Sequence, residues 1–285
     1  MSRYSNTVRP KKSLGQHFLN DMSIASRIAD TVDSCPDLPV LEVGPGMGAL
    51  TEYLLRKRRD TRVVEIDRES IAYLKEHFPM LRDSIIEDDF LRMDLSRVFG
   101  GKPFVLTGNY PYNISSQIFF KMLDYKDLIP CCTGMIQKEV AERLCSGPGN
   151  KAYGILSVLL QAWYDTEYLF TVPETVFTPP PKVKSAVVRF TRNDTASLGC
   201  DEGLFKRVVK TTFNQRRKMM RGSIKPLLSQ LDNQEWQRNP QFVEPDHAQL
   251  LAMPVFTKRP EQLSVAEFAE LTNIIANHYG KDSAV

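Results

Sequence analysis

The chain of 285 residues carries a net charge of +3 and is 42% hydrophobic, enough for one large domain with an ordinary core plus a smaller one. Charges interrupt every apolar run well before the roughly 18 residues of a membrane span, and the N-terminal "MSRYSNTVRPKKS" lacks the apolar core of a signal peptide. We therefore expect a cytoplasmic protein without membrane association. The five cysteines form no CxxC pair, so they predict thiols and no metal site.

Along the first two thirds of the chain, short β-rich runs alternate with segments of helical period. The expected strands cover residues 39–43, 62–66, 84–87, 103–107, 133–137, 166–172 and 185–190. The expected helices cover residues 23–32, 50–58, 70–77, 114–123 and 140–144. The last two strands are joined without room for a helix, which predicts an antiparallel hairpin at the end of an otherwise doubly wound α/β sheet.

A polar segment without periodicity, residues 191–203, predicts a linker. The sequence beyond it has a helical pattern, and Leu263, Phe268, Leu271 and Ile275 can share one helix face. We therefore expect two domains, 1–195 and 196–285, the second small and all-α.

The turn after the first expected strand, in "LEVGPGMGALTEYL", contains Gly44 and Gly46. Glycines there allow a sharp turn and a close approach of the backbone to a ligand, although the same cluster also suits a plain tight turn. Glu65 ends the second strand about 20 residues later, where an acid can accept hydrogen bonds from ribose hydroxyls. Asp89 and Phe90 follow the third strand and can bind and flank an adenine. Glycines, a ribose acid and an adenine acid without a pyrophosphate fingerprint predict S-adenosylmethionine (SAM).

The motif "NYPY" follows the fourth expected strand, on the same edge of the sheet. An exocyclic amine on a base is a poor nucleophile because its lone pair is delocalised into the ring. The Asn109 side-chain oxygen and the Tyr110 backbone carbonyl, separated by the rigid Pro111, can accept both N–H bonds, while Tyr112 can stack on the base. The motif predicts methyl transfer to such an amine by orientation and electrostatic stabilisation.

The segment from Gly203 to Leu231 contains eight basic residues and no Asp or Glu, which is unusual for a merely solvated helix face. A polyanion is the expected partner, although a basic surface without a ligand is the alternative. The candidate RNA-binding residues are Lys206, Arg207, Lys210, Arg216, Arg217, Lys218 and Arg221.

Several motifs along the chain together carry a family resemblance: "KKSLGQHFLND", "LEVGPGMGALTEYL", "VVEID", "EDDFL", "GNYPYNISS", "VFTPPPKVKSAVVRF" and "FNQRRKMMR". They resemble the ribosomal RNA adenine N6-dimethyltransferase family, specifically its bacterial small-subunit branch. The resemblance runs over nearly the whole chain. It implies a Rossmann-like SAM-dependent methyltransferase fold. It also implies dimethylation of two adjacent adenosines in a loop near the 3′ end of small-subunit (16S) rRNA, late in assembly of the subunit.

The resemblance also implies roles for individual residues. The cofactor-binding residues would be Gln16, His17, Leu19, Gly44, Gly46, Glu65, Ile66, Asp89, Phe90 and Asn109. Phe177 would sandwich the target base against Tyr112. The chain departs from the family at Tyr110, where Leu or Ile is usual, which affects local packing because this position acts through its carbonyl.

Three alternatives remain open at this point. The resistance branch of the same family methylates large-subunit rRNA, and a DNA adenine methyltransferase is disfavoured because nothing resembles a separate target-recognition domain. The protein could also act mainly as a non-catalytic assembly factor. The expected partner is an immature ribosomal subunit, and a monomer is the default oligomeric state.

Overall fold

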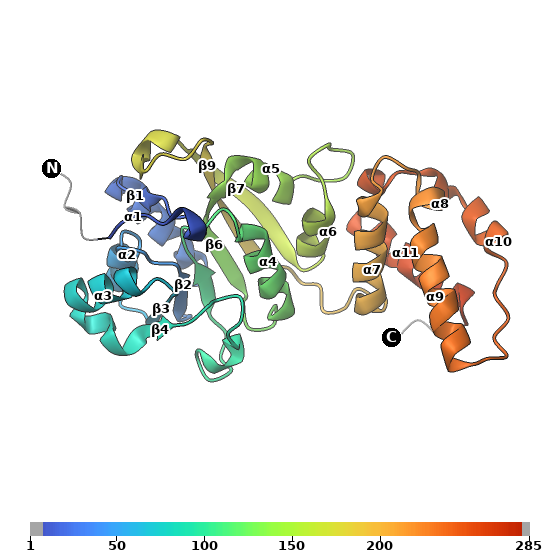
Figure 1. Cartoon of the computed structure of the whole chain (residues 1–285), viewed down its shortest axis with the longest axis horizontal. Coiled ribbons are helices and arrows are strands. Elements are labelled where there is room, and N and C mark those ends of the chain that lie inside the picture. Colours follow the sequence, from blue (N-terminus) through green and yellow to red (C-terminus); the bar gives the residue numbers. More distant parts are fainter. Residues whose placement is uncertain (1–7, 281–285) are drawn as a thin grey trace. The chain divides into compact units, whose positions relative to one another are not determined.

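The computed structural model describes residues 8–280, and the chain within it divides into two compact units (Figure 1). The first contains residues up to Glu142 together with Tyr164–Asn193, and the second contains Arg143–Trp163 together with residues from Asp194 onward. Residues 143–163, assigned to the first domain from the sequence, thus pack with the C-terminal helices. The two domains expected from the sequence, 1–195 and 196–285, stay a prediction about which segments fold independently.

The first unit is built on a seven-stranded sheet with the strand order β4-β3-β2-β5-β6-β9-β7. The strands are β2 (Val40–Val43), β3 (Thr61–Glu65), β4 (Ile85–Glu87), β5 (Val105–Thr107), β6 (Cys131–Gln137), β7 (Tyr164–Val172) and β9 (Ser185–Arg192). Neighbours from β4 to β6 are parallel, and β9 is antiparallel to both β6 and β7. This confirms the doubly wound, mostly parallel sheet with a terminal hairpin. The chain order reverses between β2 and β5, the place where such sheets bind ligands.

Helices cover both faces of this sheet (Figure 1). They are α1 (Met22–Asp30), α2 (Thr51–Arg56), α3 (Arg68–His77), α4 (Ser115–Asp124) and α5 (Lys138–Leu144). Helix α1 begins where Asp21 accepts hydrogen bonds from the backbone of Ser23 and Ile24, and its apolar face joins α2 in one core cluster with β2 and β5. On the other face, Phe119 of α4 packs edge-on against Phe190 of β9.

A two-stranded antiparallel sheet, β1 (Phe18–Leu19) and β8 (Phe177–Thr178), lies outside the main sheet and was not predicted. It pairs Phe18 with Thr178 and Leu19 with Phe177. Strands of two residues contain too few positions to show an alternating pattern, so only the long-range pairing defines them. The pairing holds the segment "GQHFL" against the loop between β7 and β9.

The second unit is helical. Its helices are α6 (Ile155–Gln161), α7 (Glu202–Asn214), α8 (Met220–Ser223), α9 (Lys225–Arg238), α10 (His247–Ala252) and α11 (Val265–His278). Helix α11 begins with a capping box formed by Ser264 and Glu267. Leu263, which precedes α11, and the α11 residues Phe268, Leu271 and Ile275 are all fully buried, which confirms the predicted shared face.

Two simple expectations can be compared with the structure directly. Among residues 8–280, none of the helices combines the length and the apolar character needed to cross a membrane. All five cysteines lie in this range and none is in a disulfide, as predicted.

Candidate active site

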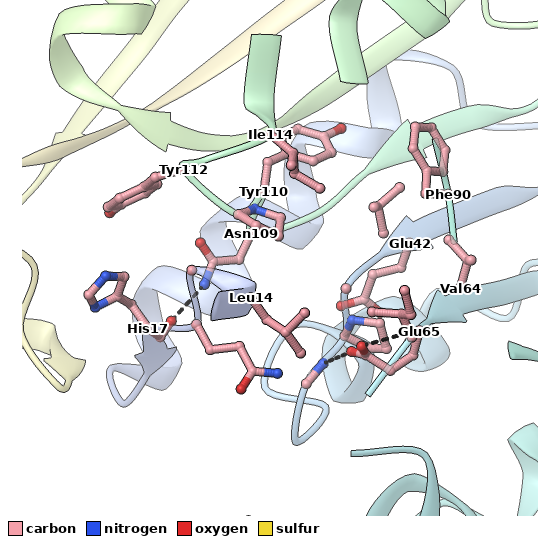
Figure 2. Close-up of a pocket in the computed structure, with 18 of the residues that line it drawn as sticks. Leu14, His17, Glu42, Val64, Glu65, Phe90, Asn109, Tyr110, Tyr112 and Ile114 are labelled. Atoms are coloured by element: carbon pink, nitrogen blue, oxygen red, sulfur yellow. Dashed lines mark hydrogen bonds between the residues drawn. The ribbon is translucent and has the colours of Figure 1, made fainter. Parts of the chain in front are cut away.

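A cavity of about 270 Å³ opens at the carboxyl ends of β2, β3 and β5, the switch point of the sheet (Figure 2). Its walls come mainly from segments that are far apart in the sequence, residues 13–19, 42–47, 49–50, 64–66, 88–91 and 109–114, together with Ile28 of α1. All of the cofactor-binding residues predicted from the sequence line it, as do Tyr110, Pro111 and Tyr112. The fold therefore brings together in one cavity the predicted cofactor-binding residues and the NYPY motif, whereas Phe177 is not among the residues that line it.

The glycine turn forms one wall of the cavity. Gly44 and Gly46 both have positive φ, 66° and 56°, which residues with a Cβ rarely adopt. A Cβ on Gly46 would lie 3.0 Å from Cε1 of Phe18. Glycine at this position therefore serves both the turn and the packing of β1.

Glu65 is buried at the end of β3 and accepts three backbone hydrogen bonds, from Gly46 (3.1 Å), Ile66 (2.8 Å) and Asp67 (2.9 Å). Burial raises the pKa of this carboxyl, and the three N–H donors oppose that rise. A carboxylate offers about four lone-pair sites, so the side chain retains acceptor capacity for a ligand. The geometry suits the predicted contact with ribose hydroxyls.

A second carboxyl, Glu42 on β2, also faces the cavity and was not predicted as a site residue. It is 1% exposed, and its Oε2 accepts a 2.6 Å hydrogen bond from the Thr51 hydroxyl. Burial raises its pKa to about 8, and the neighbouring Glu65 carboxyl adds to the rise. Glu42 is therefore mostly protonated at neutral pH in the folded protein.

Asp67, Lys11 and Gln16 form a polar cluster that ties the N-terminal segment to the edge of the sheet. The Lys11 ammonium lies 2.5 Å from Oδ1 of Asp67, and Gln16 donates to Oδ2 at 3.2 Å. These contacts, led by the Lys11 hydrogen bond, outweigh partial burial and lower the pKa of Asp67. The Gln16 oxygen accepts from the Lys11 backbone at 2.9 Å, so its amide orients the wall of the cavity. Lys11 thus neutralises an acid of its own chain.

Asp89, Phe90 and Ile66 line the end of the cavity beyond β3 and β4. Asp89 accepts a 2.9 Å hydrogen bond from the Leu91 backbone through Oδ1, and its Oδ2 lies 3.4 Å from Nε of Arg92. Phe90 is buried, whereas the Ile66 side chain is 53% exposed beside the acids. The apolar side chains match the faces of an adenine ring, and the acceptor oxygens match its edge. The glycine turn, Glu65 and this group therefore fit the cofactor that the sequence predicts.

Asn109 lies directly after β5, where an isolated parallel bridge to Met135 holds the backbone against β6. Its amide nitrogen donates a 3.1 Å hydrogen bond to the backbone carbonyl of His17. Figure 2 shows the amide oxygen on the opposite side, toward Tyr112. The hydrogen bond fixes which end of the amide faces the position predicted for the target base, beside Tyr112. The acceptor oxygen is therefore oriented before the base binds.

Tyr110 points away from the cavity and into the sheet. It is 1% exposed and donates a 3.0 Å hydrogen bond to the Thr133 carbonyl, while its ring packs edge-on against Phe119. A Cβ on Gly134 would lie 2.6 Å from Cε2 of this ring, so glycine in β6 makes room for the phenol. The tyrosine that departs from the family pattern is therefore accommodated in the core, and its backbone remains at the cavity wall beside Pro111.

Tyr112 and Phe177 do not face each other in the structure. The Tyr112 ring lies at the cavity, with its hydroxyl hydrogen-bonded to Ser185, and stacks on His17 with centroids 5.4 Å apart. Phe177 is 3% exposed and belongs to the core cluster that contains Leu19 and Val172. The predicted role of Phe177 at the base stays a prediction, and it requires the ring to leave this core.

The candidate RNA-binding residues differ in their surroundings within the second unit. Arg217, Lys218 and Arg221 are exposed. Arg216 instead lies 3.5 Å from the Glu261 carboxylate and donates to the Asn150 carbonyl, and Arg207 donates to Gln230 and Gln234. On α7, Lys206 is half-buried and Lys210 is exposed. One acidic residue from a distant segment, Glu261, thus neutralises part of the charge of the basic stretch.

One group of metal-ligating side chain types lies in the second unit, outside the cavity: Asp232, Glu244 and His247 have ligand atoms within 4.8 Å of one another. Hydrogen bonds account for the approach of Asp232 and His247, and Glu244 lies 3.9 Å from Nε2 of His247. The Asp232 carboxylate contacts His247 at 3.0 Å and accepts from the Tyr279 hydroxyl at 2.6 Å. The other His247 nitrogen lies 2.9 Å from His278.

Comparisons with known proteins agree with this geometry. The chain is 68% identical over 93% of its length to the ribosomal RNA small subunit methyltransferase A of Phocaeicola vulgatus, of which 89% is covered. A dimethyladenosine transferase from Plasmodium falciparum has the same fold, with a TM-score of 0.77, 24% identity and coverage of 94% of this chain and 100% of that one. The 23S rRNA methyltransferase ErmE is more distant, with a TM-score of 0.60, 25% identity and coverage of 90% and 99%.

The family model described as ribosomal RNA adenine dimethylase matches residues 7–252, which include every segment of the cavity and the basic stretch. The family resemblance inferred from the motifs is thereby confirmed, and the chain belongs to the ribosomal RNA adenine dimethylase family.

Proposed function

We propose that this protein uses SAM to dimethylate the N6 amines of two adjacent adenosines in the 3′-terminal loop of small-subunit (16S) rRNA. The observation that carries this proposal is the preorganised Asn109 amide beside Tyr112, at the end of a cavity that also holds the glycine turn and Glu65. The small-subunit target is supported by the 68% identity to a small subunit methyltransferase, against 25% to the 23S enzyme. We further propose that the protein acts in the cytoplasm as a monomer, late in assembly, on an immature subunit.

The cofactor supplies an electrophilic methyl group on a sulfonium, and the residues of the chain supply orientation. The Asn109 oxygen and the Tyr110 carbonyl accept the two N–H bonds of the amine, which directs its lone pair out of the base plane. Tyr112 holds the base by stacking, so the base must first leave its own stack, which single-stranded RNA loops allow at low cost. No general base is needed before transfer, because the nitrogen loses its proton only after it has become cationic.

The proposal is tested by incubating immature small subunits with the protein and methyl-labelled SAM, followed by mass spectrometry of the nucleosides. Labelled N6,N6-dimethyladenosine in small-subunit rRNA is the expected product. Labelled product only in large-subunit rRNA would favour the resistance branch. Binding to immature subunits without any labelled nucleoside would favour a non-catalytic assembly factor.

We expect Glu65→Ala to weaken SAM binding by roughly 10- to 100-fold, because a charge-assisted hydrogen bond contributes about 1.5–3 kcal/mol. Titration calorimetry with SAM measures the loss. Glu65→Gln is the matched control: it retains shape and one acceptor oxygen but no charge, so it should bind with intermediate affinity. Unchanged affinity of both variants would place the ribose elsewhere.

The exposed cations Arg217, Lys218 and Arg221 should contact RNA phosphates, so affinity for the subunit should fall steeply with salt. Replacing all three by Ala should reduce the slope of log K against log salt by about 2–3, since each phosphate contact contributes roughly 0.7–0.9. The charge-conserving triple variant R217K/K218R/R221K should retain the parent slope. The slopes are measured by filter binding. An unchanged slope in the Ala variant would mean that these three side chains contact only solvent.

A further inference from the structure

Two carboxylates and an imidazole converge in the second unit, outside the cavity described above. Asp232 lies on α9, Glu244 lies on the loop that joins α9 to α10 (Figure 1), and His247 is the first residue of α10. Nε2 of His247 lies 3.0 Å from Oδ2 of Asp232 and 3.9 Å from Oε1 of Glu244. One ligand atom from each residue lies within 4.8 Å of the other two. The three groups therefore face a common point.

The spacing of these atoms suits a tetrahedral zinc site. Zinc binds imidazole nitrogen at about 2.0–2.1 Å and carboxylate oxygen at about 2.0–2.2 Å, so two such ligand atoms at the tetrahedral angle are about 3.4 Å apart. The observed 3.0 Å and 3.9 Å lie on either side of this value, so small side-chain rotations complete the geometry. Calcium and magnesium prefer about six or more oxygen ligands, whereas imidazole favours zinc.

Hydrogen bonds around the three residues orient them as ligands. The Tyr279 hydroxyl donates to Oδ1 of Asp232 at 2.6 Å, which leaves Oδ2 to face His247. On the other side of the imidazole, Nδ1 of His247 lies 2.9 Å from Nε2 of His278. When Nδ1 carries the proton and donates it to His278, the Nε2 lone pair is directed at the carboxylates, and metal-binding histidines usually donate their second N–H in this way. When the proton is on Nε2, it bonds to Asp232, so proton and cation are alternatives at one point.

The negative charge at this point is not balanced by basic side chains. Within residues 8–280, neither Asp232 nor Glu244 forms an ion pair with a Lys or Arg, and the ionic contact of both is with His247. The side chains of Asp232 and His247 are 14% and 19% exposed, whereas that of Glu244 is 69% exposed. A cation can therefore enter from the Glu244 side, where there is also room for a water ligand.

We propose that Asp232, Glu244 and His247 bind one zinc ion, with a water molecule as the fourth ligand. His278 and Tyr279 act as positioning residues behind the ligands. The ion fixes the loop of residues 239–246, because Glu244 belongs to this loop and the other two ligands belong to the helices that it joins. The sequence predicted no metal site on the basis of its cysteines, and this site uses none of them.

The test is calorimetry of the untagged, full-length protein with zinc chloride in a buffer that does not bind zinc. We expect one equivalent to bind to the parent protein. Glu244→Gln and Asp232→Asn keep the size of each side chain and remove its charge, so each should weaken binding by at least the roughly 10- to 100-fold that losing a contact behind a ligand costs. Glu270→Gln, at an exposed carboxylate elsewhere on α11, is the matched control and should bind as the parent does.

Two further measurements address the loop and the positioning residue. Amide hydrogen exchange in residues 239–246 should slow when zinc is added to the parent protein, but not when it is added to Glu244→Gln. His278→Phe keeps a ring but loses the nitrogen that accepts from His247, so zinc affinity should fall roughly 10- to 100-fold at unchanged thermal stability of the metal-free protein.

Three results would overturn the inference. Zinc binding that survives in both Glu244→Gln and Asp232→Asn would place the ion at thiols or at other histidines. A parent protein that binds no zinc would make the cluster a hydrogen-bond network only, and displacement of zinc by calcium or magnesium would contradict the choice of metal. Glu244 is exposed, so its variant decides the outcome even where Asp232→Asn fails to fold. None of these measurements depends on methyl transfer.

Discussion

Asn109→Ala should lower kcat for both methylations by roughly 10²–10³-fold, the usual cost of removing one preorganised polar group at a reacting centre. The amide oxygen is held in place by the 3.1 Å hydrogen bond from its nitrogen to the His17 carbonyl, so it is oriented before the base arrives. Alanine removes the acceptor and leaves one amine N–H unpaired in a partly dry site. The measurement is single-turnover formation of mono- and dimethyladenosine on immature subunits.

Asn113→Ala is the matched control for this variant. Asn113 lies four residues further along the same loop, is exposed, and donates only a long hydrogen bond of 3.5 Å to the Ser13 carbonyl. Its truncation removes an amide of the same kind without removing the proposed acceptor, so its rate should stay close to that of the parent protein. If Asn109→Ala binds SAM normally and still dimethylates at near the parent rate, the catalytic role of this amide is wrong.

Glu42→Gln should stabilise the protein at neutral pH and leave it nearly unchanged at acidic pH. The Glu42 carboxyl has a pKa of about 8 in the folded protein, against an ordinary value of 4.5, because burial disfavours its charged form. The folded state therefore binds one more proton than the unfolded state between these values, so this group's contribution to stability is greatest below pH 4.5 and declines as the pH rises toward 8. At about 1.36 kcal/mol per pH unit, the loss reaches about 3 kcal/mol near pH 7.

Glutamine avoids this loss because it is neutral at every pH and its oxygen can still accept the Thr51 hydrogen bond. Chemical denaturation of parent and variant at pH 5 and pH 7.5 gives the difference in unfolding free energy at each pH. We expect a difference that grows by a few kcal/mol between the two. A difference that stays constant would mean that Glu42 is ionised in the folded protein, with a cation or water compensating its charge.

Local pattern was sufficient to predict the main sheet and its helices α1 to α5, but not every helix of the second unit. All seven predicted strands are present, because alternating or continuous apolar runs bounded by turns specify buried strands. Helix α6 was missed. Its sequence "ILSVLLQ" is apolar on nearly every side, and such a short run does not distinguish a buried helix from a buried strand.

The motifs of the candidate site could also be predicted from the sequence, because glycines, acids and "NYPY" each follow a parallel strand, and such strands end at one edge of the sheet. The contacts of individual side chains could not be predicted in this way. The β1–β8 register buries Phe177 and brings His17 to Tyr112, Asp67 is neutralised by Lys11 from 56 residues away, and Glu261 pairs with Arg216. These outcomes depend on contacts between residues distant in the chain, which no local periodicity encodes.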